Sequence, residues 1–160
     1  MPEVMEDYSI SPGLNELLLA LSRGPVSEPP WQDFLRLLGR ALSADYATLI
    51  LRPPREGDTG VVINSVVLSA EIYTEYNEER YALDPFVDLP PGEVYTIDEF
   101  MPLLEYYESE YYQQYVKATG IAYLMGADMW DELGNSARLR LARLHDSSNF
   151  GQAERDLCKL

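Results

Sequence analysis

Cysteine and histidine are almost missing from this 160-residue chain, which has one of each, Cys158 and His145. A single cysteine cannot form an internal disulfide, so we expect a reducing compartment and a packing role for Cys158 in a terminal helix. One histidine and one distant cysteine do not form a metal-ligand pattern, and no Gly-rich phosphate loop is visible. No nucleophile with an oxyanion site is signalled around His145. We therefore expect no metal, no cofactor and no enzymatic activity.

Long apolar runs are also missing, since runs such as Leu17 to Leu21 are far too short to span a bilayer. The acidic N-terminus lacks the basic and apolar regions of a signal peptide. A hydrophobic content of 46% with 11% aromatic residues excludes disorder as the main state. We expect a soluble, cytoplasmic chain with one buried core.

Basic residues are scarce, and the formal net charge is −15. The excess of negative charge lies between positions 56 and 132, which contain 17 acidic residues and only two basic ones, Arg80 and Lys117. Such a face repels nucleic-acid phosphates, so any DNA contact must come from a part not present in this chain. Composition favours a solvated face that aids solubility, with docking of a basic partner or mimicry of nucleic acid as the alternatives.

The pattern of apolar and turn-forming residues predicts a mixed α/β (α+β) order. Strands are expected at 45–52, 61–68, 94–97, 121–130 and 137–145, and helices at 14–22, from 31, at 70–81, at 97–119 with a break near Ser109, and from 149 to the end. Thr96 and Glu99 have the spacing of a capping box. This order fits a single central antiparallel sheet of about five strands flanked by helices, as in PAS and GAF sensor domains, with a pocket between sheet and helices.

The stretch YNEERYALDPFVDLPP, from Tyr76 to Pro91, joins the end of an aromatic helix to an Asp-Pro turn. Phenol groups and a partly buried carboxylate, here Asp84, are the usual make-up of a small-molecule pocket. The alternative is that Tyr76 and Tyr81 pack in the core and Asp84 caps the turn, and spacing alone favours this alternative.

Alternation along the predicted strand at 121–130 places Tyr123 and Met125 on one face and Asp128 on the other. On the last strand Arg143 shares a face with two leucines and is expected to point inwards, where it needs a carboxylate partner or an anionic ligand. A structural ion pair with an acidic residue such as Asp84 or Asp128 is the default, and a ligand contact is the alternative. More rings come from Tyr111, Tyr112 and Tyr115, for which core packing and dimer contact compete with a pocket role.

Four segments together resemble the N-terminal sensor half of LuxR-type helix-turn-helix transcriptional regulators: WQDFLRLLGRALSADYATLILR, YNEERYALDPFVDLPPGEVYTIDEF, ESEYYQQYVKATGIAYLMGADMW and LRLARLHDSSNFGQAERDLCKL. The resemblance covers residues 31–160, after a tail and first helix at 1–30. It implies a PAS/GAF-like sensor domain that forms a homodimer and binds a small molecule. It also implies a DNA-binding domain after residue 160, absent from this chain.

In the autoinducer-binding members of that family, a Tyr followed by a nearby Asp-Pro lines the acyl-homoserine lactone site, and Tyr76 with Asp84-Pro85 matches this pattern. Ile72 stands where those members place a tryptophan, so the resemblance implies a sensor domain more than any named signal. The alternative is a ligand-free dimerisation or protein-docking module with an acidic surface. The candidate ligand-binding residues are Tyr73, Tyr76, Tyr81, Asp84, Phe86, Tyr111, Tyr123, Met125 and Arg143.

Overall fold

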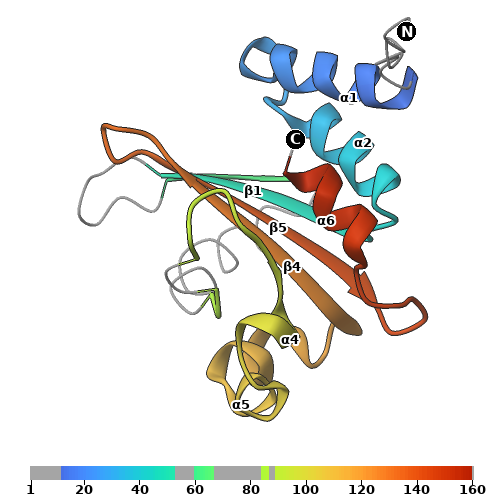
Figure 1. Cartoon of the computed structure of the whole chain (residues 1–160), viewed down its shortest axis with the longest axis vertical. Coiled ribbons are helices and arrows are strands. Elements are labelled where there is room, and N and C mark those ends of the chain that lie inside the picture. The colour runs from blue at the N-terminus through green and yellow to red at the C-terminus, as the bar shows by residue number, and fades with distance from the viewer. Residues whose placement is uncertain (1–11, 53–59, 67–83, 87–88, 160) are drawn as a thin grey trace, which may run out of the picture.

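A five-stranded antiparallel sheet forms the centre of the molecule (Figure 1), with the strand order β2-β1-β5-β4-β3. The computed structural model describes residues 12–52, 60–66, 84–86 and 89–159. The strands are β1 (Tyr46–Arg52), β2 (Val61–Asn64), β3 (Val94–Thr96), β4 (Ile121–Trp130) and β5 (Ser136–Leu144). The prediction of a single antiparallel sheet of about five strands is therefore confirmed.

The long β4–β5 hairpin determines which side chains share a face of the sheet. Asp128 lies directly opposite Arg138, and Gly126 directly opposite Arg140. Directly paired residues of antiparallel strands point to the same side, so these four positions share one face. Met125 and Leu141, also paired, point to the other face.

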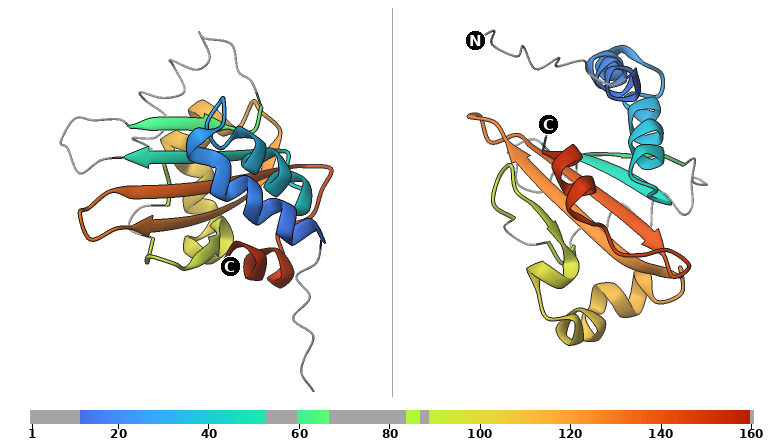
Figure 2. Two further views of the ribbon diagram at one scale, coloured as in Figure 1. Left: turned by 90° about the horizontal axis from the view of Figure 1, so that it is seen from above. Right: turned by 45° about the vertical axis from the view of Figure 1, so that its right-hand side comes forward.

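The helices α2 (Gln32–Ala41) and α6 (Gln152–Cys158) lie against the face that carries Met125, which we call the helix-covered face, and α1 (Pro12–Arg23) packs on α2 (Figures 1 and 2). The helix α2 follows Pro29-Pro30 and buries the stripe that includes Leu35 and Leu38, as its periodicity predicts. The buried core on this side consists of Leu17, Leu35, Leu38, Leu42, Ala47, Ile63, Val94, Met125, Leu141 and Phe150.

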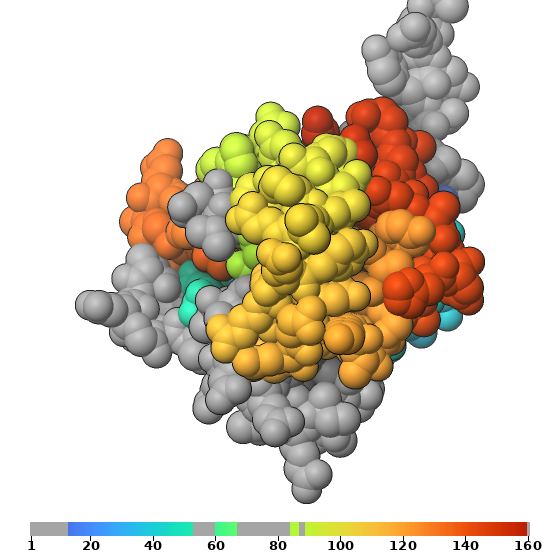
Figure 3. All heavy atoms as spheres, turned by 90° about the horizontal axis from the view of Figure 1, so that it is seen from below, coloured from blue at the N-terminus to red at the C-terminus, as the bar shows by residue number. Residues whose placement is uncertain are grey.

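The opposite face, which we call the Asp84 face, carries a second apolar cluster. Two short helices and a π-helical turn contribute to it: α4 (Ile97–Phe100), α5 (Leu103–Glu108) and η3 (Tyr112–Val116). Figure 3 views the molecule from this side, with α4 and α5 in yellow and light orange in front of the sheet. The buried members are Phe86, Leu89, Ile97, Tyr106, Tyr111, Val116, Ile121, Leu124 and Ala142.

The region 97–119 is broken twice, although the sequence predicts one break near Ser109. The additional break falls at Met101, whose backbone is extended at φ −149° and ψ 158° because Pro102 follows it. The predicted capping box also differs, since the Thr96 hydroxyl donates to the Glu99 carboxylate at 3.0 Å and makes no cap to a backbone N–H. The predicted helix at 70–81 and the last two residues of the predicted strand 61–68 lie outside the described residues.

Within the described part of the chain, each helix is too short or too polar to cross a membrane.

Candidate ligand-binding site

The short segment 84–86 lies against the Asp84 face and is buried there. The Phe86 ring is 2% exposed and lies 5.5 Å from the Phe100 ring, centroid to centroid. Gly126 makes room for this arrangement, because a Cβ at position 126 would lie 3.1 Å from Phe86 Cδ2 and 3.2 Å from Arg140 Nη1. A glycine in a central strand is expected where another group approaches the backbone this closely.

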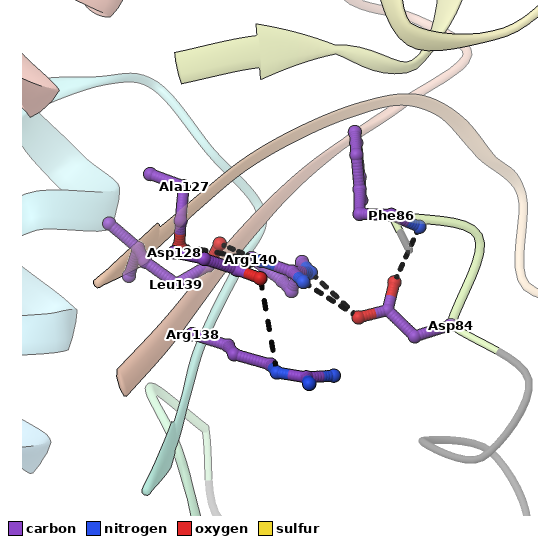
Figure 4. Close-up of polar contacts among 7 residues, drawn as sticks. All are labelled: Asp84, Phe86, Ala127, Asp128, Arg138, Leu139 and Arg140. Carbon is purple, nitrogen blue, oxygen red and sulfur yellow. Dashed lines mark hydrogen bonds and ion pairs between the residues drawn. The ribbon is translucent and has the colours of Figure 1, made fainter. Parts of the chain in front are cut away.

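Both oxygens of the Asp84 carboxylate are engaged within the protein (Figure 4). The backbone N–H of Phe86 donates to Oδ1 at 3.1 Å. Arg140 donates to Oδ2 from Nε at 3.0 Å and from Nη2 at 2.8 Å, so two N–H groups of its guanidinium converge on one carboxylate oxygen. Asp84 therefore closes its own turn and holds Arg140.

Arg140 is the centre of the polar cluster on this face. Its Nη1 donates to Asp128 Oδ1 at 2.6 Å and to the Leu139 carbonyl at 3.0 Å, and its guanidinium lies 5.1 Å from the centre of the Phe86 ring. Burial by itself lowers the pKa of Arg140, but Asp84 and Asp128 outweigh this and raise it above its ordinary value. Arg140 is thus a permanently charged group compensated by two buried carboxylates.

Arg138 completes the cluster with much weaker contacts. Its Nε lies 3.9 Å from Asp128 Oδ2, beyond hydrogen-bond distance, and its guanidinium carbon is 6.0 Å from the centre of the Trp130 ring. The Nε atom of Arg138 is buried and has no hydrogen-bond partner. The same is true of the side-chain nitrogen Nδ2 of Asn64. Arg138 and Asn64 are therefore polar groups with unused donors on the same face.

The predicted ligand-binding residues divide between the two faces. Asp84, Phe86 and Tyr111 belong to the Asp84 face. Tyr123, Met125 and Arg143 lie on the helix-covered face, with the alternation that the sequence predicts for β4. A single small molecule cannot contact both sets, because the sheet lies between them. Tyr73, Tyr76 and Tyr81 lie outside the described residues.

The predicted structural ion pair of Arg143 with an acidic residue is confirmed, but the partner is neither Asp84 nor Asp128. Arg143 instead pairs with Glu154 of α6 at 3.0 Å, and its guanidinium lies 4.3 Å from the centre of the Phe150 ring. It also donates to four backbone carbonyls, those of Leu42, Ser43, Ser148 and Asn149. The two suggested partners were wrong because Arg143 faces the helices together with Leu139 and Leu141, whereas Asp84 and Asp128 lie on the other side.

Sequence reasoning missed Arg140, although a usable signal was present. If Arg143 shares a face with Leu139 and Leu141, then Arg138 and Arg140 must share the other face, where alternation had already placed Asp128. Two arginines beside a buried aspartate would then have predicted the cluster.

The sole histidine and cysteine take no part in this site. His145 is exposed just after β5, and its backbone N–H donates to the Gly120 carbonyl at 3.1 Å. Burial raises the pKa of the Cys158 thiol to about 11, so the thiol stays protonated near neutral pH. Among the described residues, no group of three or more His, Cys, Asp and Glu side chains is placed to hold a metal ion.

A separate open groove of about 630 Å³ lies at the end of the sheet near the β4–β5 turn. The predicted ligand-binding residues do not contribute to it. It is lined by Leu51, Arg52, Gly60, Val61, Met129, Trp130, Asp131, Asn135, Ser136 and Ala137.

This arrangement of one antiparallel sheet between helices is the fold of solved ligand-binding domains of LuxR-family transcriptional regulators. One similar structure is the N-acylhomoserine lactone dependent LuxR-family transcription factor CepR2 from Burkholderia cenocepacia, with a TM-score of 0.66 and 19% identity over 91% of this chain and 87% of that chain. Another is the VqsR ligand-binding domain from Pseudomonas aeruginosa, with a TM-score of 0.61 and 18% identity over 92% of each chain. Escherichia coli SdiA has a TM-score of 0.58 and 15% identity over 90% of this chain and 63% of that chain.

No family model matches the chain, and no curated protein sequence matches it. The likeness therefore concerns the fold, and the expected resemblance to the sensor half of LuxR-type regulators is confirmed at that level.

Proposed function

We propose that this chain is the ligand-sensing domain of a LuxR-type transcriptional regulator and binds a small molecule against the Asp84 face of its sheet. The observation that carries the proposal is the buried cluster of Asp84, Arg140 and Asp128 beside the Phe86 ring. Burying charged groups costs free energy that a purely apolar core avoids, and beside this cluster the Nε of Arg138 has no hydrogen-bond partner, so a polar group of a ligand could pair there. The fold shared with CepR2 and the VqsR domain supports the same role.

Binding would be measured as a rise in the melting temperature of the purified chain. The panel would contain N-acyl homoserine lactones of several chain lengths, because CepR2 depends on this class, together with neutral and acidic amphiphiles of matched length. A ligand present at 100 times its Kd stabilises a folded protein by about 2.7 kcal/mol, which raises the Tm of a domain of this size by roughly 5–10 °C. We expect a saturable rise with at least one member.

The matched variants are Gly126→Val, whose side chain would push against the Phe86 ring and the Arg140 guanidinium, and Leu133→Ala at a side chain 79% exposed. We expect the first to lose the ligand-induced rise and the second to keep it. Phe86→Leu serves the same purpose if Gly126→Val is unfolded. A chain that gains no stability from any compound would refute ligand sensing and favour the ligand-free docking module.

The proposal includes a homodimer and regulation of an appended helix-turn-helix DNA-binding domain. Sedimentation equilibrium of the chain tests the dimer. The coding sequence after Leu160 tests the second part, because we expect it to encode a basic helix-turn-helix pattern. A different downstream domain would refute the assignment to a transcriptional regulator without affecting the ligand-binding test.

A further inference from the structure

Arg138 is the least compensated charge in the buried cluster. The cluster contains two carboxylates and two guanidinium groups, but the strong contacts go to Arg140, which binds Asp84 at 2.8 Å and Asp128 at 2.6 Å. The nearest carboxylate oxygen to Arg138 is that of Asp128, 3.9 Å from its Nε, and the Arg138 side chain is only 21% exposed to solvent. A largely buried cation without hydrogen bonds is unfavourable unless another group pairs with it.

The unused polar groups on this face are donors. Asn64 lies opposite Thr48 on β1, which in turn lies opposite Arg140, so Asn64 and the arginines share the Asp84 face. Among the described residues, the buried unpartnered side-chain atoms on this face are Arg138 Nε and Asn64 Nδ2. The Asp84 carboxylate, by contrast, already accepts three hydrogen bonds. Acceptor oxygens of a ligand could therefore pair with the unused donors on this face, whereas an N–H group of a ligand would find no free acceptor at Asp84.

The neighbours of Arg138 define the shape of such a ligand. Ile50 lies opposite Arg138 on β1, and Val62 opposite Ile50 on β2, and both are buried apolar side chains. On the other side Asp128 is the one charged side chain that faces Arg138 from β4 in the described residues, and Trp130 lies at the rim. The apolar surface open to a ligand with its polar head at Arg138 is therefore the half-exposed Trp130 ring, since Ile50 and Val62 are already covered by protein.

We propose that Arg138 anchors the carboxylate of a ligand whose apolar body lies against the half-exposed Trp130 ring at the rim of this face. The guanidinium has five N–H groups in a planar fork that matches the two oxygens of a carboxylate. A bound carboxylate would supply the acceptor that Arg138 lacks and complete the pairing of the second arginine. This inference rests on the proposed ligand-sensing function and specifies the ligand class.

The probes are decanoate and decanamide, which share an apolar chain and differ in the charge of the head group. Binding would be followed by calorimetry and by Trp130 fluorescence in a Trp31→Phe background, which leaves Trp130 as the single tryptophan. We expect decanoate to bind more tightly than decanamide and to change the Trp130 signal, because the Trp130 ring lies 6.0 Å from Arg138.

The variants are Arg138→Gln, Arg138→Lys and the control Arg36→Gln, at an arginine whose side chain is 52% exposed. We expect Arg138→Gln to weaken decanoate binding by roughly tenfold or more, the usual effect of losing a charged hydrogen-bonding partner, and to leave decanamide unchanged. Arg138→Lys should retain part of the preference for decanoate, since it keeps the charge and loses the planar fork.

The inference is overturned if decanoate does not bind, if both probes bind equally, or if Arg138→Gln leaves decanoate binding unchanged. In each of these cases a melting-temperature rise with a neutral ligand would still support the ligand-sensing function. Loss of ligand sensing would instead appear as no stabilisation by any member of the wider panel.

Discussion

At the scale of single residues, Asp84 acts within the protein itself. Its carboxylate joins the turn at 84–86 to Arg140, a residue 56 positions away in the sequence. The buried pair lowers the freedom of this segment and holds the Phe86 ring beside Gly126. A ligand N–H group could bind Asp84 only by competing with Arg140 or with the Phe86 backbone.

Asp84→Asn is expected to destabilise the fold by about 3 kcal/mol, because removing one partner of a buried ion pair leaves the other insufficiently compensated. Asp33→Asn is the control, since Asp33 and Arg36 form a pair with side chains 71% and 52% exposed. That change should cost less than about 1 kcal/mol. Urea unfolding of both variants provides the comparison, and equal losses would contradict a structural role for Asp84.

At the scale of elements, Arg143 attaches α6 to the rest of the helix-covered face. It binds Glu154 of α6, the carbonyls of Ser148 and Asn149 just before that helix, and the Leu42 carbonyl at the end of α2. The helix α6 has only 7 residues, and a helix of this length is not stable alone in water. Its position therefore depends on tertiary contacts such as these.

Arg143→Met should cost about 2–4 kcal/mol, because it leaves buried carbonyls without a donor. We also expect hydrogen exchange in α6 to become faster, since the helix would open locally before the sheet unfolds. Gln152→Ala is the matched change on the exposed side of α6, where Gln152 bonds Asp156 at 2.8 Å. Exchange in α6 that is unaltered by Arg143→Met, or altered equally by Gln152→Ala, would argue against this attachment.

At the scale of the whole molecule, three carboxyl groups link stability to pH. Burial raises the pKa of Asp98, but hydrogen bonds from Thr96 and Asn149 outweigh it and lower the pKa below 3.8. A backbone hydrogen bond within Glu154 and the Arg143 side chain lower the pKa of Glu154 below 4.5. The Asn135 side chain lowers that of Asp131 below 3.8. For each group the unfolded chain binds a proton more readily than the folded chain does.

Stability should therefore be constant above about pH 5 and fall as the pH drops through the unfolded and then the folded pKa values of these groups. Urea unfolding between neutral and acidic pH measures this, in added salt so that the net charge of −15 is screened. Asp131→Asn should make the fall in stability at acidic pH less steep. The ionised Asp131 carboxylate accepts hydrogen bonds from two backbone N–H groups and from the Asn135 amide, and protonation weakens these bonds. A stability that rises on acidification would contradict these assignments.

Local patterns predicted most of the elements. The strand β4 spans Ile121–Trp130, the range that its apolar sequence and flanking turns predict, and α2 follows Pro29-Pro30 as expected. The site was less predictable. Asp84 and Phe86 were anticipated from the Asp-Pro turn, but Arg140 was missed, and Glu154 was not among the partners suggested for Arg143.

By itself, the sequence determined the type and position of the elements, the acidic character of the chain and the alternation of side chains along β4, because these depend on neighbours a few residues apart. Only the tertiary structure decided which arginine meets which carboxylate. Arg140 and Asp84 are 56 residues apart and Arg143 and Leu42 are 101 apart, so their contacts depend on strand register and on which face each helix covers. A shift of one residue in register would exchange the two faces and with them the partners of both arginines.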